Sequence, residues 1–559
     1  MNLKLYLQKK LEKTIKTVWP ETADKNFEIE INYPPDIKFG EYTSNVALKL
    51  APLVRQSAIE IANQIKDKIG KLPAFSGVEV VQPGFLNFYL DKKWLARQLP
   101  LILMEKEKYG RSDFGRGKKV QVEFVSANPT GPIHVGNGRG GFMGDALANI
   151  LQYAGYRVQR EYYVNDVGKQ VGILAESVLR RYWQHQGIKI EYPEYCYQGK
   201  YIEELAAKLF LPNYKLNHVH KLEEVRDKIK GRILQKMIGN VKRLLEKKLK
   251  IKYDRWFSEK SLYNSGEVDR VIQFLKSQHW LYKSEGAIWL KTKEFGDDKD
   301  RVLIKADGEP VYFLSDIAYH WNKFTKRGFD KVIDIWGADH HGYMGRMQAA
   351  MKIIGHSGKL DILIVQLVRL VSRGQEVRMS KRSGTFITLE ELVDQVGLDA
   401  ARFFFLMHDF NTHMDFDLDL AKKKSKDNPV FYVQYAHARI CSIIKKAKIL
   451  IQGKSKKKLH KVKLPPSNQS ADLEPSEVIL IKELLKWPEL VVDIAGNYQV
   501  NKLPFYAIDL ATNFHDFYTK CRVIDGGKVN ERRYQIIQAS QIVLQNCLAA
   551  MGVDAPERM

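Results

Sequence analysis

Hydrophobic residues recur at two different spacings along this chain, and the changes of spacing divide it into three regions. The first region, residues 1 to about 112, mixes both spacings. It opens with apolar residues at helical intervals, namely Leu3, Leu7, Leu11 and Ile15. Further on, Val78–Val81 and Phe85–Leu90 are short apolar runs joined by Pro83-Gly84, which is typical of two strands and a turn. The mixture predicts a small α+β domain.

The second region, residues 113 to about 425, alternates strand-like apolar runs with helical patterns. The strand-like runs are Lys118–Ser126, Tyr156–Val164, Val302–Ile304, Lys331–Trp336 and Asp361–Leu370. Alternation of this kind predicts an α/β domain with a doubly wound, Rossmann-like parallel sheet. A lysine-rich stretch with helical periodicity, at about 199–285, is expected to be a helical insertion on that sheet.

The third region, residues 426–559, has helical periodicity almost throughout. Asp427-Asn428-Pro429 is a typical helix start, and Pro475 opens a second helical pattern. The first of these helices carries an apolar stripe at Val433, Ala436, Ile440 and Ile444. This region is therefore predicted to be an all-helical domain.

Composition favours one class of partner and argues against others. The 559 residues include 89 Lys and Arg against 65 Asp and Glu, a formal net charge of +24. Such an excess favours a polyanion as partner. No apolar run approaches the ~18 residues that indicate a membrane span, so no membrane contact is expected. The four cysteines are scattered without metal-ligand spacing, which predicts a cytoplasmic protein with no structural zinc and no other metal site.

The segment between Lys118 and Gly155 carries the strongest chemical signal. A strand pattern, a loop rich in turn formers and the sequence HVGNGRGG lead into a helical pattern, as in phosphate-binding sites at helix starts. One interpretation is a dinucleotide site, because Gly136, Gly138 and Gly141 fit G-x-G-x-x-G and Glu161 follows 20 residues later. The other centres on His134, whose imidazole, just ahead of the helix, can donate to the α-phosphate of a nucleotide.

A second basic and glycine-containing segment lies far along the chain, in Arg378–Gly384 (RMSKRSG). A cationic loop of this kind can close over a leaving pyrophosphate and neutralise the charge that develops on it. Lys381 is the central lysine of this segment.

These two segments together resemble the signature motifs of class I aminoacyl-tRNA synthetases. HVGN at His134–Asn137 resembles the HIGH motif, with Asn137 where histidine is usual, and Arg378–Ser383 resembles KMSKS. The flanking sequences VEFVSANPTGPIHVG and GDALANILQYAGY are similar to the arginyl branch of that class. QPGFLNFYL near the start, and PVFYVQYAHARI and GVDAPERM near the end, resemble the same family, so the resemblance spans all three regions.

The resemblance implies a fold, a reaction and its substrates. It implies a class I catalytic domain between an N-terminal domain that grips the tRNA corner and a helical anticodon-binding domain. The implied reaction activates L-arginine with ATP and Mg²⁺ to arginyl-adenylate and pyrophosphate. Arginine then passes to the 2′-hydroxyl of the terminal adenosine of tRNA(Arg). A monomer and a chain without an editing domain are expected.

Residue roles follow from the matched motifs. The implied catalytic residues are His134, Asn137 and Lys381. Gly136, Gly138, Met379 and Ser380 join these three in binding ATP.

The same matching implies residues for the amino acid and the tRNA. The implied arginine-binding residues are Glu123, Asn128, Tyr312, Asp316 and Asp339, with His340 as an alternative to the last. Carboxylates suit this task because a planar guanidinium pairs with them bidentately. Alternation in Phe85–Leu90 places Phe85 and Asn87 on the face away from the core, and the resemblance implies that they contact a base in the dihydrouridine loop of the tRNA. Tyr435 and Arg439 are expected to serve the anticodon domain, although a core aromatic would explain Tyr435 equally well.

Three other functions remain open from the sequence. A related class I synthetase for lysine or cysteine would share both motifs, although a cysteine enzyme usually needs zinc. A dinucleotide oxidoreductase would explain the glycines but not the Lys381 segment. An RNA-binding homologue without activity would explain the positive charge and the helical domain.

Overall fold

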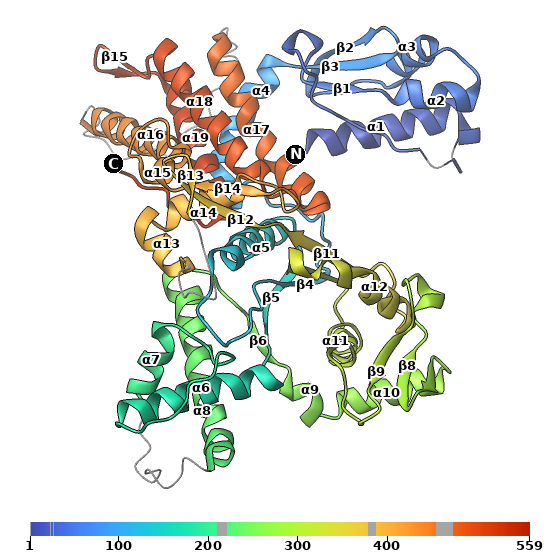
Figure 1. The fold of residues 1–559 in the computed structure, drawn as a ribbon. Helices are drawn as coiled ribbons and strands as arrows, with labels where there is room; N and C mark the ends of the chain where they lie inside the picture. The colour runs from blue at the N-terminus through green and yellow to red at the C-terminus, as the bar shows by residue number, and fades with distance from the viewer. Residues whose placement is uncertain (1, 23, 26, 210–220, 378–386, 454–472) are drawn as a thin grey trace.

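The computed structural model describes residues 2–22, 24–25, 27–209, 221–377, 387–453 and 473–559. Figure 1 shows an α/β body in the middle of the molecule, a small N-terminal domain and a helical C-terminal domain side by side above it, and two lobes below it. The central body carries the candidate site.

The N-terminal domain is the predicted α+β unit. Its antiparallel sheet has the order β1-β3-β2, and its elements are α1 (Leu3–Val18), β1 (Tyr42–Ser44), α2 (Val46–Val54), α3 (Ala58–Lys68), β2 (Phe75–Val81) and β3 (Phe85–Leu90). The helical spacing at the start of the chain reflects a buried face, since Leu3, Leu7 and Leu11 are all in the core. Helix α4 (Lys92–Glu105) then leads toward the C-terminal domain, where it packs on α19 (Glu531–Met551).

The central body contains a five-stranded sheet of order β11-β10-β4-β5-β6, with every neighbouring pair parallel. The strands are β4 (Lys119–Glu123), β5 (Arg157–Val164), β6 (Arg255–Ser258), β10 (Lys331–Gly337) and β11 (Leu360–Val365). The chain builds one half from β4 outward to β6 and then returns to place β10 on the other side of β4. This reversal confirms the doubly wound prediction and puts the topological switch point between β4 and β10, where such sheets bind ligands.

The prediction of a helical insertion at about 199–285 is correct for the first half of that stretch and wrong for the second half, which contains strands. Helices α6 (Lys169–His185), α7 (Lys200–Ala207) and α8 (Leu222–Arg243) form a helical lobe, which a π-helical turn at Leu244–Lys248 closes. Strand β6 then joins the main sheet beside β5, inside the stretch expected to be helical. A strand of four residues is too short to show a clear alternation between the helical patterns around it.

The second lobe holds a small antiparallel sheet of order β7-β8-β9. Its elements are α9 (Lys260–Asn264), α10 (Glu267–Ser277), β7 (Leu281–Ser284), β8 (Ala287–Leu290), β9 (Arg301–Ile304) and α11 (Tyr312–Trp321). Val302–Ile304 is therefore a strand, as predicted, but of this small sheet rather than the main one. Helix α11 runs on into a π-helical turn at Asn322–Lys326 before β10 begins.

The predicted strand Asp361–Leu370 is two strands in different sheets. After β11 the chain turns, and β12 (Val368–Ser372) pairs with β13 (Gln375–Glu376) and β14 (Met414–Asp417). The remaining helices of the body are α5 (Val135–Tyr153), α12 (Met344–Ile353), α13 (Leu389–Val396), α14 (Leu398–Leu406) and α15 (Leu418–Lys422). Buried Arg139 on α5 donates to the carbonyls of Gln366 and Asp409, so it fixes the turn between the two strands.

The C-terminal region is helical, as predicted. It consists of α16 (Pro429–Gly453), α17 (Pro475–Asn497), α18 (Lys502–Lys520), a hairpin of β15 (Ile524–Asp525) and β16 (Lys528–Val529), and α19. The buried Glu489 on α17 binds the N-terminal domain, since its Oε1 accepts the backbone N–H of Leu3 at 2.8 Å and that of Lys4 at 3.0 Å. Within the described ranges, none of the helices combines the length and apolar composition that crossing a bilayer requires.

Candidate active site

The loop after β4 brings the first candidate residues to the carboxyl edge of the sheet. Directly after β4, Val125 and Ser126 have positive φ values of 69° and 38°, a conformation that costs energy for a β-branched residue such as valine. The Ser126 hydroxyl holds this turn, because it donates to Glu123 Oε1 at 3.1 Å and accepts the backbone N–H of Tyr163 at 3.0 Å. The chain thereby turns away from the sheet after β4 and continues as a loop to His134, where α5 begins.

His134 is the N-cap residue of α5 and lies half-buried beside the segment that follows the second motif. A Cβ on Gly136 would come within 3.2 Å of the imidazole, so the ring lies against the first turn of the helix. His134 forms an isolated β-bridge with Thr388, and Leu389 N donates to the carbonyl of Ile133 at 2.9 Å. Asn137 follows within the same turn, also half-buried.

Three implied ATP-binding residues, Met379, Ser380 and Lys381, lie outside the described residues. What the structure describes is the chain on either side of them, from Val377 backward and from Ile387 onward. Thr388 follows Lys381 by seven residues in the sequence and is bonded to His134. The described segment that follows the second motif thus pairs with the residue that begins α5.

The glycines of the segment pack a helix rather than form a dinucleotide turn. Gly136, Gly138 and Gly141 all lie within α5, where a Cβ on Gly138 would come within 2.4 Å of Leu389 and one on Gly141 within 3.2 Å of Val125. Glu161, the acidic residue of that interpretation, is fully buried and bound to Arg327. The dinucleotide interpretation is therefore wrong, since its glycines do not form the required tight turn and its carboxylate is occupied.

Helix α11 carries the predicted pair of guanidinium-binding residues on one face. Tyr312 is 61% exposed, and its hydroxyl lies 2.9 Å from where a Cβ on Gly168 would stand. Asp316, one turn along, is half-buried and accepts a short hydrogen bond from the Tyr343 hydroxyl. Burial raises the pKa of the Asp316 carboxyl, while the Tyr343 hydroxyl acts in the opposite sense.

Glu259 is a candidate that the sequence analysis missed. It directly follows β6 and is only 1% exposed, and neither its Oε2 nor the buried Tyr163 hydroxyl makes a hydrogen bond of ordinary geometry within the described residues. Burial, with the charges of Asp316 and Asp166, raises the pKa of Glu259 to about 7. The Tyr163 and Ser315 hydroxyls lie close enough to Glu259 to act against that rise in pKa. The carboxylates of Glu259 and Asp316 thus lie near each other, an arrangement that favours a cationic ligand.

The other implied substrate residues lie around the same edge. The Asn128 side chain donates to Gln170 Oε1 at 2.9 Å and accepts from Asn165 at 3.1 Å. Asp339 is largely exposed in the short 3₁₀ helix Ala338–Tyr343, with its carboxylate 3.6 Å from His340 Nε2.

Glu123, at the end of β4, is buried and belongs to a charged cluster. Its Oε2 accepts from Lys323 Nζ at 2.7 Å and from the Tyr319 hydroxyl at 2.8 Å. Burial raises the pKa of Glu123, while the positive charge of Lys323 opposes that rise.

The implied tRNA-binding residues lie away from this edge. On β3 of the N-terminal domain, Phe85 is half-buried, but Asn87 is only 3% exposed, which corrects the expectation that alternation leaves its side chain open. On α16, Tyr435 is 42% exposed and stacks with His515, and Arg439 lies 5.6 Å from the Tyr435 ring centroid. Exposure excludes the alternative that Tyr435 is a core aromatic.

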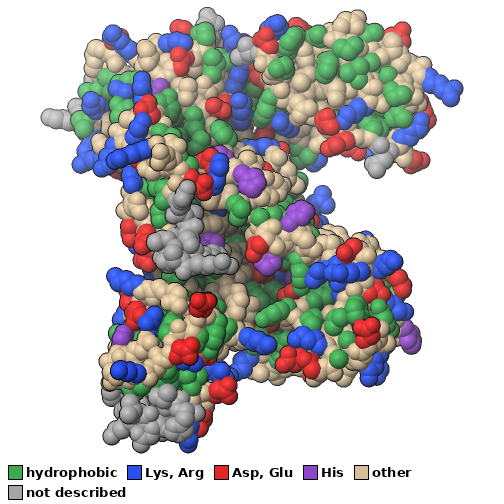
Figure 2. All heavy atoms as spheres, in the orientation of Figure 1, with side chains coloured by type: hydrophobic (Ala, Val, Ile, Leu, Met, Phe, Trp, Pro, Cys, Tyr) green, Lys and Arg blue, Asp and Glu red, His purple; other side chains and the backbone are tan. Residues whose placement is uncertain are grey.

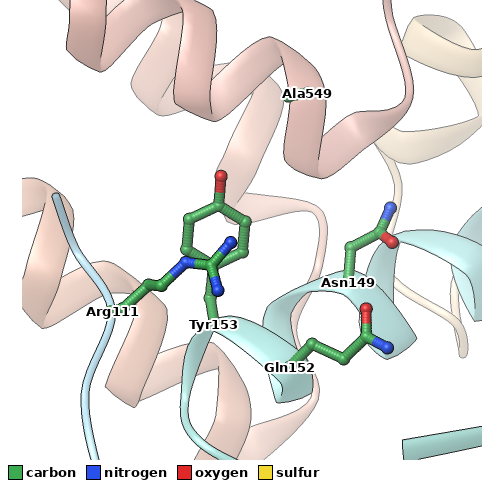
Figure 3. A pocket seen from close by; sticks show the side chains of 5 residues that line it. All are labelled: Arg111, Asn149, Gln152, Tyr153 and Ala549. Atoms are coloured by element: carbon green, nitrogen blue, oxygen red, sulfur yellow. The ribbon is translucent and has the colours of Figure 1, made fainter. Parts of the chain in front are cut away.

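Two cavities in the described part of the molecule lie elsewhere. They have volumes of about 430 and 660 Å³ and adjoin each other at Tyr153, at the far end of α5 from His134. Figure 3 shows the smaller one, where the Arg111 guanidinium lies in front of the Tyr153 ring and Asn149 and Gln152 project from α5. Figure 2 shows a hollow between the two lower lobes, below a group of histidine side chains. In the described part of the chain, no group of three His, Cys, Asp or Glu residues could hold a metal ion.

Comparison with known families agrees with this geometry. Residues 98–415 match the family described as tRNA synthetases class I (R), catalytic domain. Residues 2–90 match the arginyl tRNA synthetase N terminal domain, and residues 433–559 match the DALR anticodon binding domain. The parallel sheet, the histidine at the start of α5 and the catalytic-domain match define the chain as a class I aminoacyl-tRNA synthetase.

Individual relatives identify the family within this class. The chain is 44% identical to arginine–tRNA ligase of Moorella thermoacetica over 539 residues, which cover 95% of this chain and 93% of that one. It is 43% identical to the Carboxydothermus hydrogenoformans enzyme of the same name, covering 96% and 95%. The chain belongs to the arginyl-tRNA synthetase family.

Solved structures show the same fold. A Campylobacter jejuni protein assigned as an arginyl-tRNA synthetase aligns with a TM-score of 0.73 and 34% identity, covering 84% of this chain and all of that one. Thermus thermophilus arginyl-tRNA synthetase aligns over the full length of both chains, with a TM-score of 0.76 and 22% identity. The latter supports the fold alone.

Proposed function

We propose that this chain activates L-arginine with ATP, releases pyrophosphate, and transfers arginine to the 2′-hydroxyl of the terminal adenosine of tRNA(Arg). The observation that carries the choice of amino acid is the acidic pocket formed by Asp316 and Glu259 at the carboxyl edge of the sheet. In this proposal arginine held by these two carboxylates reaches an ATP bound at the start of α5, because both α5 and β6 are joined to the carboxyl edge of the sheet.

The pocket fits a guanidinium group. A guanidinium presents five N–H donors in one plane and pairs bidentately with carboxylates. Glu259 is a buried carboxylate near the Tyr163 and Ser315 hydroxyls, and Asp316 adds a second carboxylate beside it. A neutral or shorter side chain would leave these groups unsatisfied, so the same chemistry that favours arginine rejects its analogues.

The start of α5 and the segment around Lys381 supply the ATP site in this proposal. The ATP-binding residues are His134, Gly136, Asn137 and Gly138 from α5, and Met379, Ser380 and Lys381 from the second motif. His134 donates to the α-phosphate that the arginine carboxylate attacks, and Lys381 neutralises the departing pyrophosphate. Support comes from the backbone contact of His134 with Thr388, a few residues after Lys381. Mg²⁺ accompanies ATP and balances its phosphate charge.

No side chain forms a covalent intermediate in this proposal. Catalysis rests on positioning the carboxylate against phosphorus and on charge stabilisation in the transition state. Glu123, Asn128 and Asp339 hold the α-amino group and backbone of arginine. Each lies at or just past the carboxyl end of a neighbouring strand.

tRNA binding is assigned to the two domains above the catalytic body. Phe85 contacts the tRNA corner. The exposed Tyr435 and the half-buried Arg439 beside it bind a base at the anticodon end. We expect the enzyme to act in the cytoplasm as a monomer.

The test is amino-acid-dependent exchange of pyrophosphate into ATP by the purified chain, with and without tRNA(Arg). Each of the twenty amino acids is offered separately. Exchange should depend on arginine alone and should be strongest with tRNA present. Exchange with lysine or cysteine, or none with arginine and tRNA together, would refute the proposal.

A further inference from the structure

We propose that Lys323 is a positioning residue for arginine: it aligns the Glu123 carboxylate and ties it, through Asp334 and His320, to the helix that carries Asp316. The inference rests on the proposed function, in which Glu123 binds the α-ammonium and Asp316 the guanidinium. It adds a residue that touches neither end of the substrate.

Lys323 is completely buried, and both of its ion-pair partners are buried as well. Its Nζ lies 2.7 Å from Glu123 Oε2 and 2.9 Å from Asp334 Oδ1, and 4.2 Å from the centroid of the Tyr319 ring. A charge in such a place is tolerated only when it is paired, so the lysine and the two carboxylates depend on one another.

The position of Lys323 follows from an irregularity in its helix. Helix α11 is regular from Tyr312 to Trp321 and changes to a π-helical turn at Asn322–Lys326. A π turn inserts one extra residue and rotates the following side chains, and such turns are frequent at functional sites. Here the turn places Lys323 between Glu123, the last residue of β4, and Asp334, in the middle of β10, at the switch point of the sheet.

Asp334 links Lys323 to His320, and His320 in turn contacts the backbone of Asp316. Its Oδ2 lies 2.9 Å from His320 Nε2, and His320 Nδ1 lies 2.8 Å from the carbonyl oxygen of Asp316. The connection therefore runs from Glu123 on β4 through Lys323, Asp334 and His320 to Asp316 on α11. Every side chain between the two ends is buried, which gives it a fixed geometry.

Tyr319 supports the same carboxylate independently of Lys323. Its hydroxyl lies 2.8 Å from Glu123 Oε2 and 2.6 Å from Glu161 Oε1 and has one proton to donate. Arg327 Nη1 donates to Glu161 at 2.9 Å and so offsets the charge of that second carboxylate.

The electrostatic role of Lys323 has a consequence for pH dependence. The groups that face Glu123 are Lys323, Tyr319, Asp334, Glu161 and the tyrosines Tyr163 and Tyr253. Burial and the neighbouring carboxylates raise the pKa of Glu123, and Lys323 is the positive charge that acts against them. Without that charge Glu123 takes up a proton at higher pH, and a protonated Glu123 cannot pair with an ammonium group.

The experiment compares KM for arginine and KM for ATP in pyrophosphate exchange between pH 6.5 and 8.5. Lys323→Met removes the charge and keeps the length of the side chain. Tyr319→Phe removes one hydroxyl and leaves all buried charges in place. Lys331→Met is the matched control, because Lys331 lies on β10 and pairs with Asp361 outside this cluster.

For Lys323→Met we expect KM for arginine to rise at least tenfold more than KM for ATP, with the rise growing as the pH falls. For Tyr319→Phe we expect a smaller rise, several-fold, with the same selectivity for arginine. Equal changes in both constants, or a pH profile like that of the wild type, would overturn the inference. If Lys323→Met does not fold, Asp334→Asn, which weakens the ion pair that holds Lys323, is measured in the same way, and equal changes in both constants for that variant overturn the inference. A wild type without arginine-dependent exchange would defeat the proposed function instead.

Discussion

Replacing Asp316 by asparagine tests the guanidinium pocket with the smallest possible change in shape. Asp316→Asn keeps an oxygen that can accept from the Tyr343 hydroxyl, so helix α11 should keep its contact with the 3₁₀ helix after β10. What is lost is the negative charge opposite the guanidinium, together with one acceptor of a bidentate pair.

The size of the effect follows from the burial of the site. Losing one partner of a buried, hydrogen-bonded charge pair costs about 2–5 kcal/mol. Asp316 is half-buried, and Glu259 remains beside it, so we take the lower part of that range, about 2–3 kcal/mol. At about 1.4 kcal/mol for each factor of ten, KM for arginine should rise about 30- to 150-fold.

The assay is arginine-dependent pyrophosphate exchange with tRNA(Arg) at saturating ATP, followed by the ATP dependence at saturating arginine. KM for ATP should change less than threefold, because the proposed ATP site at the start of α5 does not include Asp316. Asp269→Asn, on the exposed face of α10, makes the same chemical change far from the site and should behave as wild type. An unchanged arginine dependence in a folded Asp316→Asn variant would refute the assignment.

Three further predictions concern the other parts of the site. Because the pKa of Glu259 is raised to about 7 and only the carboxylate pairs with guanidinium, KM for arginine should increase up to tenfold per pH unit below pH 7 and level off above it. Glu259→Gln should raise KM and remove this dependence, and a wild-type KM that stays flat between pH 5.5 and 8 would contradict it. Lys381→Ala should lower the exchange rate by two orders of magnitude or more while tRNA affinity, measured by filter binding, changes little; equal losses would place Lys381 in tRNA binding instead. With a net charge of +24, tRNA affinity should fall steeply as salt rises from 50 to 200 mM, and a flat response would separate the basic surface from tRNA docking.

Local patterns predicted the elements that build the site, because they lie within single segments. The strand, loop and helix around His134 are contiguous, and the four-residue interval between Tyr312 and Asp316 places both on one face of α11. The doubly wound sheet also followed from alternation of strands and helices.

Contacts between distant segments could not be predicted in the same way. Glu259 lies in a stretch whose helical surroundings hid the short strand β6, and nothing in the local sequence marks its burial against Tyr163. Lys323 meets Glu123 across 200 residues, and the π-helical turn that brings it there leaves no periodic signal. Asn87 fails for a related reason: alternation assigned its face, but the neighbouring strands on both sides of β3 decide its exposure.

The most direct test of the central claim is a crystal structure of the chain with arginine and a non-hydrolysable ATP analogue. We predict that the guanidinium binds Asp316 and Glu259, and that the triphosphate lies at the start of α5 between His134 and Lys381. A nucleotide bound away from His134, for instance in the cavity beside Arg111 and Tyr153, would contradict the account.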